Sequence, residues 1–274
     1  MKSEIIYSAA SVQIVTQPYL VGPELEVLEL ASSQDFARAL PADLPADAVS
    51  LEILNGGHYY FVAPAFEAVR GTSCPVTSIR AKRGFDDATQ SWKVRCWDKG
   101  GADADECESL LVGDTVATGT TLAGTLRQHL DARLANGKSL PNVYVFAIAG
   151  SDIVTESVQA MRDVSALLKA NGKSLKIYFA NAQYKLDKNG TDLAFLLGKF
   201  ESQSEVEIRA KLGEFLPHMK CCVWDWGDRF REVDNHLAEI KEYYESVSAP
   251  AWLLEGIAQR IASRAATPPD APKA

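Results

Sequence analysis

The chain has 274 residues, 47% of them hydrophobic and 23% charged, and a formal net charge of −8. These are values of a globular protein, and the length suits one large domain or two small ones. The negative charge argues against a nucleic acid or an anionic membrane as partner. Five cysteines, an odd number, favour a reducing compartment, and the start is too polar for a secretory signal, so we expect a cytoplasmic protein.

The first part of the chain, residues 1–45, is predicted to be an N-terminal extension with short β-like pieces at 5–7, 12–16 and 25–30. From residue 49 onward, apolar strand patterns alternate with helical ones. Strands are predicted at 49–54, 76–82, 92–97, 109–113, 143–149, 175–181 and 221–224. Helices are predicted at 61–69, 120–134, 155–170, 205–216, 232–247 and 251–264. This alternation predicts an α/β fold, a mostly parallel twisted sheet flanked by helices.

The most informative stretch is 109–122, SLLVGDTVATGTTL. A buried apolar strand is followed by Asp114, a turn of small and hydroxyl residues, and a helix. Backbone N–H groups at a helix N-terminus together with threonine hydroxyls can bind a phosphate monoester, and a carboxylate can accept hydrogen bonds from vicinal ribose hydroxyls. The candidate phosphate-binding residues are Asp114, Thr115, Val116, Ala117, Thr118, Gly119, Thr120 and Thr121. An ordinary threonine-capped strand–turn–helix is the alternative, and neither a P-loop nor a Rossmann fingerprint is present.

Three further segments carry possible chemistry. A strand is followed by the turn Leu54, Asn55, Gly56 and Gly57, whose glycines allow backbone amides to approach an anion. Residues 78–87, SIRAKRGFDD, deliver several cations before a polar loop, and residues 223–232, VWDWGDRFRE, combine acidic, aromatic and arginine side chains. The structural alternatives are a plain turn, a solvated basic strand end and an aromatic core strand.

Together these segments resemble type I phosphoribosyltransferases, most closely the hypoxanthine–guanine branch. The resemblance covers 49–149 and recurs at 223–232. It implies a core at 46–150, a variable hood at 151–222 and a late core segment with C-terminal helices at 223–264. Residues 265–274 are rich in proline and alanine, which predicts a disordered tail. The resemblance further implies that Leu54, Asn55, Gly56 and Gly57 bind pyrophosphate and that residues 83–98 close over the substrates. The implied side-chain roles are pyrophosphate contacts from Arg80, Lys82 and Arg231, base stacking by Trp224, and Mg²⁺ binding by Asp225 and Asp114.

The activity implied is Mg²⁺-dependent transfer of the 5-phosphoribosyl group of phosphoribosyl pyrophosphate (PRPP) to a nucleobase-like heterocycle. The partners would be PRPP, pyrophosphate and a nucleobase or nucleoside monophosphate, and the protein could form a homo-oligomer. Three positions depart from the family pattern: Asn55 replaces a basic residue, Gly113 an acidic one, and Ala117 the acidic residue of 6-oxopurine enzymes. Two alternatives therefore stay open, a non-catalytic protein that binds PRPP or a nucleotide, and an enzyme that hydrolyses or phosphorolyses a ribosyl phosphate.

Overall fold

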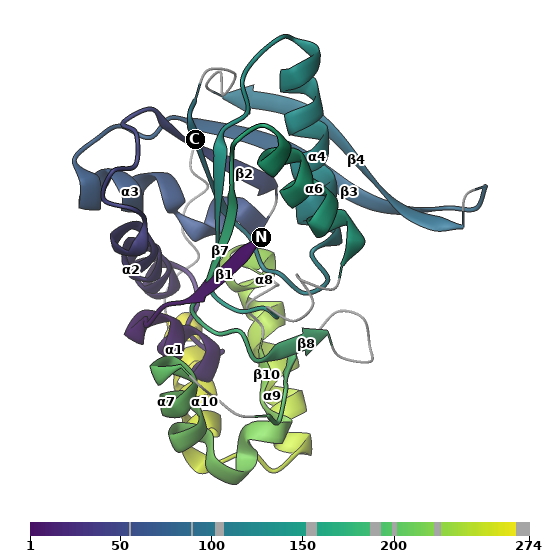
Figure 1. Cartoon of the computed structure of the whole chain (residues 1–274). Coiled ribbons are helices and arrows are strands. Elements are labelled where there is room, and N and C mark those ends of the chain that lie inside the picture. Colours follow the sequence, from purple (N-terminus) through teal and green to yellow (C-terminus); the bar gives the residue numbers. More distant parts are fainter. Residues whose placement is uncertain are drawn as a thin grey trace.

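The computed structural model describes residues 1–54, 56–88, 90–101, 107–151, 158–186, 193–198, 202–221 and 226–266. Its central feature is a seven-stranded sheet with the order β1-β7-β6-β5-β2-β3-β4, in which every neighbouring pair is parallel except β3 with β4 (Figure 1). The strands are β1 (Lys2–Ile5), β2 (Ala48–Leu54), β3 (Val76–Asp86), β4 (Ser91–Gly101), β5 (Ser109–Gly113), β6 (Asn142–Ala147) and β7 (Leu175–Phe179). The predicted fold class is confirmed.

Helices cover both faces of this sheet because the central strands are apolar on both sides. On one face, α4 (Thr120–Ala135) and α6 (Gln159–Ala170) pack against Leu51, Val112 and Val145. The other face carries α2 (Pro23–Ala39) and α3 (Val62–Arg70). There, Phe36 stacks on Phe146 with ring centroids 5.1 Å apart. The carboxyl ends of β2 and β5, which hold the predicted site, are thereby fixed between two cores.

The N-terminal region differs from the prediction. Only the first β-like piece overlaps a strand, β1, which pairs in parallel with β7 at the sheet edge. The other two pieces are helical, in α1 (Ala9–Thr16) and α2. The reason is local: the Ser8 side chain caps α1 by accepting from the Ser11 N–H, and Pro23 begins α2 with acidic residues in its first turn.

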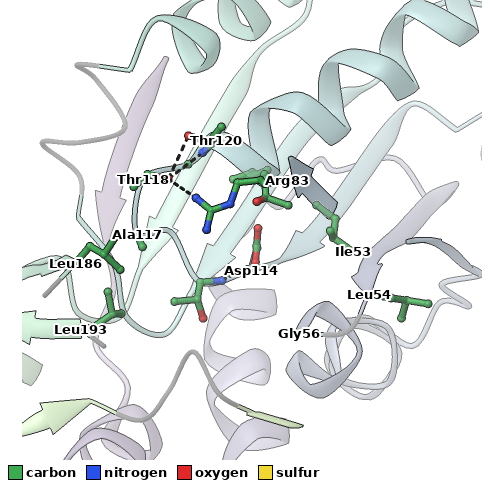
Figure 2. Close-up of a pocket in the computed structure, with 14 residues that line it drawn as sticks. Ile53, Leu54, Gly56, Arg83, Asp114, Ala117, Thr118, Thr120, Leu186 and Leu193 are labelled. Atoms are coloured by element: carbon green, nitrogen blue, oxygen red, sulfur yellow. Dashed lines mark hydrogen bonds between the residues drawn. The ribbon is translucent and has the colours of Figure 1, made fainter. Parts of the chain in front are cut away.

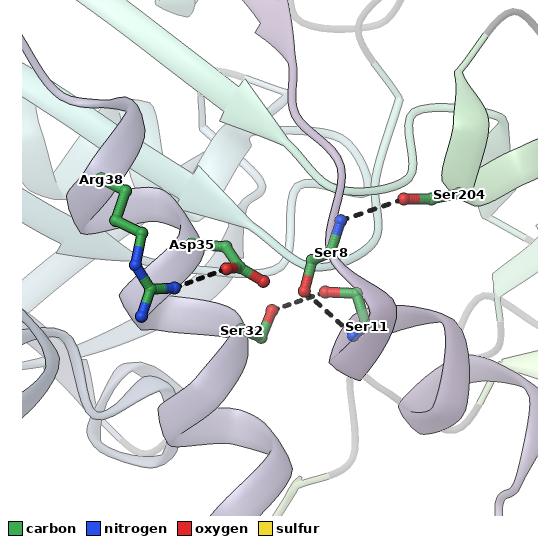
Figure 3. Close-up of polar contacts among 6 residues, drawn as sticks. All are labelled: Ser8, Ser11, Ser32, Asp35, Arg38 and Ser204. Atoms are coloured by element: carbon green, nitrogen blue, oxygen red, sulfur yellow. Dashed lines mark hydrogen bonds and ion pairs between the residues drawn. The ribbon is translucent and has the colours of Figure 1, made fainter.

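Buried serines join these N-terminal helices to the rest of the molecule (Figure 3). The Ser11 and Ser32 hydroxyls form a hydrogen bond between α1 and α2, and the Ser8 N–H donates to Ser204 Oγ at 3.2 Å. Ser204 lies in α7 (Gln203–Leu212), far along the chain. Since unpaired buried hydroxyls are costly, these bonds fix how the three helices pack. Residues 8–39 are thus part of the common core.

A helical lobe with a small second sheet lies below the main sheet (Figure 1). The second sheet is antiparallel, with the order β10-β9-β8. Its strands are β8 (Tyr184–Leu186), β9 (Leu193–Phe195) and β10 (Lys220–Cys221). The helical elements are α7, η2 (Gly213–His218), α8 (Trp226–Phe230), α9 (Val233–Ser246) and α10 (Ala251–Ala266). Within the described ranges, every helix is too short or too polar to cross a membrane.

A long hairpin of β3 and β4 projects from the body (Figure 1). The sequence predicted strands at 76–82 and 92–97, and both are longer in the structure, where β3 and β4 run for 11 residues each. The hairpin contacts α4. A Cβ on Gly124 of α4 would lie 2.5 Å from Val94 Cγ2, and Gln128 Nε2 donates to the Val94 carbonyl at 2.7 Å. The hairpin is therefore held against the helix that begins at the predicted phosphate turn.

Candidate functional site

The site begins where β5 ends. The Asp114 N–H donates to the Phe146 carbonyl at 3.0 Å, which extends the pairing with β6 by one residue. The Thr115 N–H donates to Asp114 Oδ1 at 2.8 Å and so orients the carboxyl group. The next residue, Val116, turns its side chain into the core. It is the one predicted phosphate-binding residue that does not line the cavity.

The threonine turn leads directly into α4. Gly119 has a φ of +68°, a conformation that favours glycine, and its carbonyl accepts the first helical bond from the Ala123 N–H at 2.8 Å. The Thr118 hydroxyl donates to the Thr120 hydroxyl at 3.1 Å and accepts from the Thr120 N–H at 3.4 Å. Hydroxyls and the positive end of the helix dipole thus meet at one wall of the cavity, as a phosphate requires.

Arg83 completes this wall from the hairpin. Its Nη1 donates to Thr118 Oγ1 at 3.5 Å, and Figure 2 shows the guanidinium over the turn. Side chains alternate along β3, so Arg83 shares the α4 face with Ile79 and Ala81. Val94, the residue opposite Arg83 in the hairpin, packs on α4. The resemblance placed Arg83 only at the start of the closing segment 83–98 and gave it no contact of its own, although the apolar spacing of Ile79 and Ala81 indicates this face.

The other predicted cations lie elsewhere. Arg80 and Lys82 alternate with Arg83 on β3 and are exposed, and neither lines the cavity. Arg231 is exposed between α8 and α9 and does not line it either. The pyrophosphate role that the resemblance implied for these three residues stays a prediction. Asn55, Trp224 and Asp225 lie outside the described residues. So do residues 222–224 of the predicted strand 221–224 and residues 267–274 of the predicted tail.

The cavity itself has a volume of about 340 Å³. Its described lining comes from β2 and the turn after it, from the hairpin, from the threonine turn and from the second sheet. These residues are Ile53, Leu54, Gly56, Arg83, Asp114, Thr115, Ala117, Thr118, Gly119, Thr120, Thr121, Leu122, Leu186 and Leu193. In Figure 2 Asp114 lies in the middle, with Ala117, Leu186 and Leu193 to one side and Leu54 and Gly56 to the other. Gly57, the fourth residue of the predicted pyrophosphate turn, is buried and does not line the cavity.

The Asp114 carboxyl has an unusual proton affinity. Burial raises its pKa to about 7, although the Thr115 N–H and the nearby charge of Arg83 both lower it. The carboxyl is therefore partly protonated near neutral pH. A perturbed carboxyl in a cavity is a frequent property of functional sites.

A divalent cation is compatible with these side chains. The described residues contain no group of three or more histidine, cysteine, aspartate or glutamate side chains that could hold a metal by themselves. Mg²⁺ keeps several waters and is bound in proteins by one or two carboxylates together with substrate phosphates. Asp114, the acidic side chain of the described cavity wall, fits that mode once a phosphorylated ligand is present.

Comparison with known proteins gives distant structural matches only. No protein-family model and no curated protein matches the chain. A purine phosphoribosyltransferase from Pyrococcus horikoshii matches with 11% identity and a TM-score of 0.36, over 74% of this chain and 98% of that one. An adenine phosphoribosyl transferase from Trypanosoma brucei, in complex with AMP, pyrophosphate and ribose-5-phosphate, matches with 14% identity and a TM-score of 0.36, over 74% and 87%. A hypoxanthine-guanine phosphoribosyltransferase from Bacillus anthracis matches with 14% identity and a TM-score of 0.34, over 47% and 69%.

The chain is similar to phosphoribosyltransferases. These are the proteins that its sequence motifs resemble. At such identities and TM-scores the likeness carries no conclusion about activity, substrate or metal.

One arginine of the late segment has a structural position that the sequence did not reveal. Arg229 is fully buried and donates to the carbonyls of Ile14 at 3.3 Å, Gln17 at 3.1 Å and Leu20 at 2.7 Å. It thereby satisfies carbonyls at and just beyond the end of α1 and ties α8 to the N-terminal region.

We expect Arg229→Ala to lower the free energy of unfolding by about 3 kcal/mol, because several buried carbonyls lose their donor. Arg231→Ala, two residues away and exposed, is the matched control and should change stability by less than about 0.5 kcal/mol. Urea unfolding followed by circular dichroism measures both. Equal losses in the two variants would contradict the structural role of Arg229.

Proposed function

We propose that this protein is a Mg²⁺-dependent phosphoribosyltransferase, which transfers the 5-phosphoribosyl group of PRPP to a nucleobase-like heterocycle and releases pyrophosphate. The observation that supports this most is the order of chemical groups along one cavity. Hydroxyls and a helix N-terminus suit the 5-phosphate, the Asp114 carboxyl suits ribose hydroxyls, and the turn at Leu54 and Gly56 suits a second anion. Leu186 and Leu193 offer apolar contact to a heterocycle.

In this proposal the protein acts by binding, orientation and charge. The threonine turn and Arg83 hold the 5-phosphate, so the ribose lies over Asp114. The carboxylate accepts hydrogen bonds from the ribose hydroxyls and helps to hold the cation. When bound, Mg²⁺ supplies charge stabilisation to the leaving pyrophosphate. Fixing the two reactants in one cavity supplies the remaining advantage, since displacement at the ribose carbon needs alignment more than covalent catalysis.

The first test is calorimetric titration with PRPP, with and without Mg²⁺, followed by a screen of heterocycles for pyrophosphate release. Mg²⁺-dependent binding together with pyrophosphate release supports the transferase. An absence of PRPP binding under both conditions would overturn it.

A non-catalytic protein that binds PRPP or a nucleotide is the second candidate. One observation favours it: within the described cavity wall Arg83 is the one cation, while Arg80 and Lys82 lie on the opposite face of β3. A leaving pyrophosphate carries more negative charge than a single 5-phosphate. PRPP binding without pyrophosphate release for any heterocycle would support this alternative.

We expect Arg83→Ala to weaken PRPP binding about tenfold, because a charge-assisted phosphate contact is lost. Arg95→Ala is the matched control. Arg95 is exposed on the same hairpin and pairs opposite Lys82, so it lies on the face away from α4. Calorimetry at constant salt measures both affinities. If the two variants lose affinity equally, the effect comes from net charge and Arg83 has no specific contact with the ligand.

A further inference from the structure

Tyr60 connects the turn that follows β2 with the turn that follows β5. It ends the short helix η1 (Gly56–Tyr60), which begins at the cavity wall with Gly56. Its side chain is fully buried, yet the hydroxyl lies 2.9 Å from Thr115 Oγ1. A residue of the turn after β2 thus forms a hydrogen bond with the residue that follows Asp114.

The tyrosine side chain also occupies space next to the end of β5. A Cβ on Gly113 would lie 2.3 Å from Tyr60 Cβ and 2.6 Å from Tyr60 Cγ, so a side chain at position 113 and this placement of Tyr60 exclude each other. Gly57 also lies close to Gly113, since a Cβ on Gly57 would lie 3.2 Å from the Gly113 carbonyl oxygen. The two turns are therefore in direct contact, and Gly113 contributes no group of its own to the site.

The position of Tyr60 is fixed by its surroundings. Ser33 Oγ of α2 donates to the Tyr60 carbonyl, and the Tyr60 ring packs edge-on against Phe146 with centroids 5.9 Å apart. Burial raises the pKa of Tyr60 well above its usual value, so the hydroxyl keeps its proton. A rigid, neutral hydroxyl is well suited to orient a neighbouring side chain.

We propose that Tyr60 is a positioning residue, which fixes Thr115 and through it the Asp114 carboxylate that contacts the ribose. The second link is the Thr115 N–H, which donates to Asp114 Oδ1 at 2.8 Å. This inference rests on the proposed function, because it requires that Asp114 contact a ribosyl phosphate. Two separate supports then hold the ligand-binding groups. Tyr60 fixes the ribose contact at Asp114, and the start of α4 fixes the phosphate contact.

The two supports can be separated with two ligands. Ribose 5-phosphate reaches both Asp114 and the threonine turn, whereas inorganic phosphate needs the turn alone. We expect Tyr60→Phe to weaken ribose 5-phosphate binding about tenfold and to leave inorganic phosphate binding unchanged, both measured by NMR titration. A purely structural loss would weaken both ligands alike. Tyr178→Phe is the control, because Tyr178 is equally buried and packs on Phe36, away from the site.

A double-mutant cycle completes the test. Thr115→Val keeps the backbone N–H and removes the hydroxyl, so it should cause the same loss as Tyr60→Phe, and the double variant should lose no more than either. Additive losses, or ribose 5-phosphate affinity in Tyr60→Phe equal to that of the wild type, would overturn the role of Tyr60 while leaving the proposed function in place. If the wild-type protein binds neither ribose 5-phosphate nor PRPP, the proposed function fails and this inference with it.

Discussion

Asp114→Asn is expected to change binding and stability in opposite directions. At pH 8 the ionised carboxylate accepts hydrogen bonds from the ribose and helps to hold the cation, so its loss should weaken PRPP binding at least about tenfold. Affinity of the wild-type protein should rise as pH increases through about 7, the pKa that burial gives this carboxyl. The variant should lack that pH dependence. Calorimetric titration between pH 5.5 and 8.5 measures both effects.

The stability effect follows from the same pKa. Because the folded state holds this proton more tightly than the unfolded chain does, the wild-type protein loses stability as pH rises from about 4 to about 7. Above pH 7 the full cost of a buried carboxylate is present. Asparagine removes this cost, so at pH 8 we expect Asp114→Asn to be more stable than the wild type by about 1–2 kcal/mol. The gain is smaller than for a fully enclosed carboxylate, because Asp114 lines the cavity and is partly exposed to solvent.

Asp131→Asn is the control for Asp114→Asn. Asp131 is exposed on α4 and paired with Arg127 at 2.7 Å, so its loss should move neither binding nor stability by more than about 0.5 kcal/mol. Wild-type PRPP affinity in Asp114→Asn would remove Asp114 from the site. Unchanged stability at pH 8 would show that the carboxyl is well solvated.

Gly113→Ala is expected to lower the free energy of unfolding by about 3 kcal/mol. The added methyl group would lie 2.3 Å from Tyr60 Cβ, and Tyr60 is fully buried in the core on the face of the sheet that carries α2 and α3. Either the tyrosine or the end of β5 has to move, and both support the site. Ligand binding should therefore fall together with stability.

Gly84→Ala is the control for Gly113→Ala, because an added Cβ at this position of β3 has no atom within 4 Å. It should be neutral in urea unfolding. If Gly113→Ala were as stable as the wild type, Tyr60 would have room to move, and the crowding between these two residues would not be a constraint.

Most strands and helices from residue 48 onward were predictable, because the central strands are apolar runs and helices such as α6 and α9 are amphipathic. The outer part of the hairpin and the short strands β8 and β9 were not predicted. The strand predicted at 109–113 coincides with β5 (Ser109–Gly113). The N-terminal helices were not predicted, because β-branched residues such as Val12, Ile14 and Val15 suggested strands. Burial against α2 and the lower lobe outweighs that preference. The local signals that could have revealed the helices were the N-cap Ser8 and Pro23 at the first helical position of α2.

The site was predictable in its turns and less so in its cations. Asp114 and the threonines follow a strand and begin a helix, so local sequence suffices to place them at the end of the sheet. Which cation reaches them depends on strand alternation and on the length of the hairpin. The resemblance assigned Arg80 and Lys82 to pyrophosphate, which stays a prediction, and it assigned no cation to the threonine turn. The structure places Arg83 at this turn. Tyr60 could not be predicted, since its contact with Gly113 joins two distant turns.

The position of β1 has a consequence for synthesis of the chain. Lys2 pairs opposite Lys176 and Ile5 opposite Phe179, so β1 has no partner in the sheet until β7 has been made. At roughly 5–20 residues per second, that delay is on the order of 10 s. Closing so long a loop also slows the pairing in the free chain. A fusion partner attached at this end of the chain would therefore act on a late step of folding, when the edge of the sheet is completed.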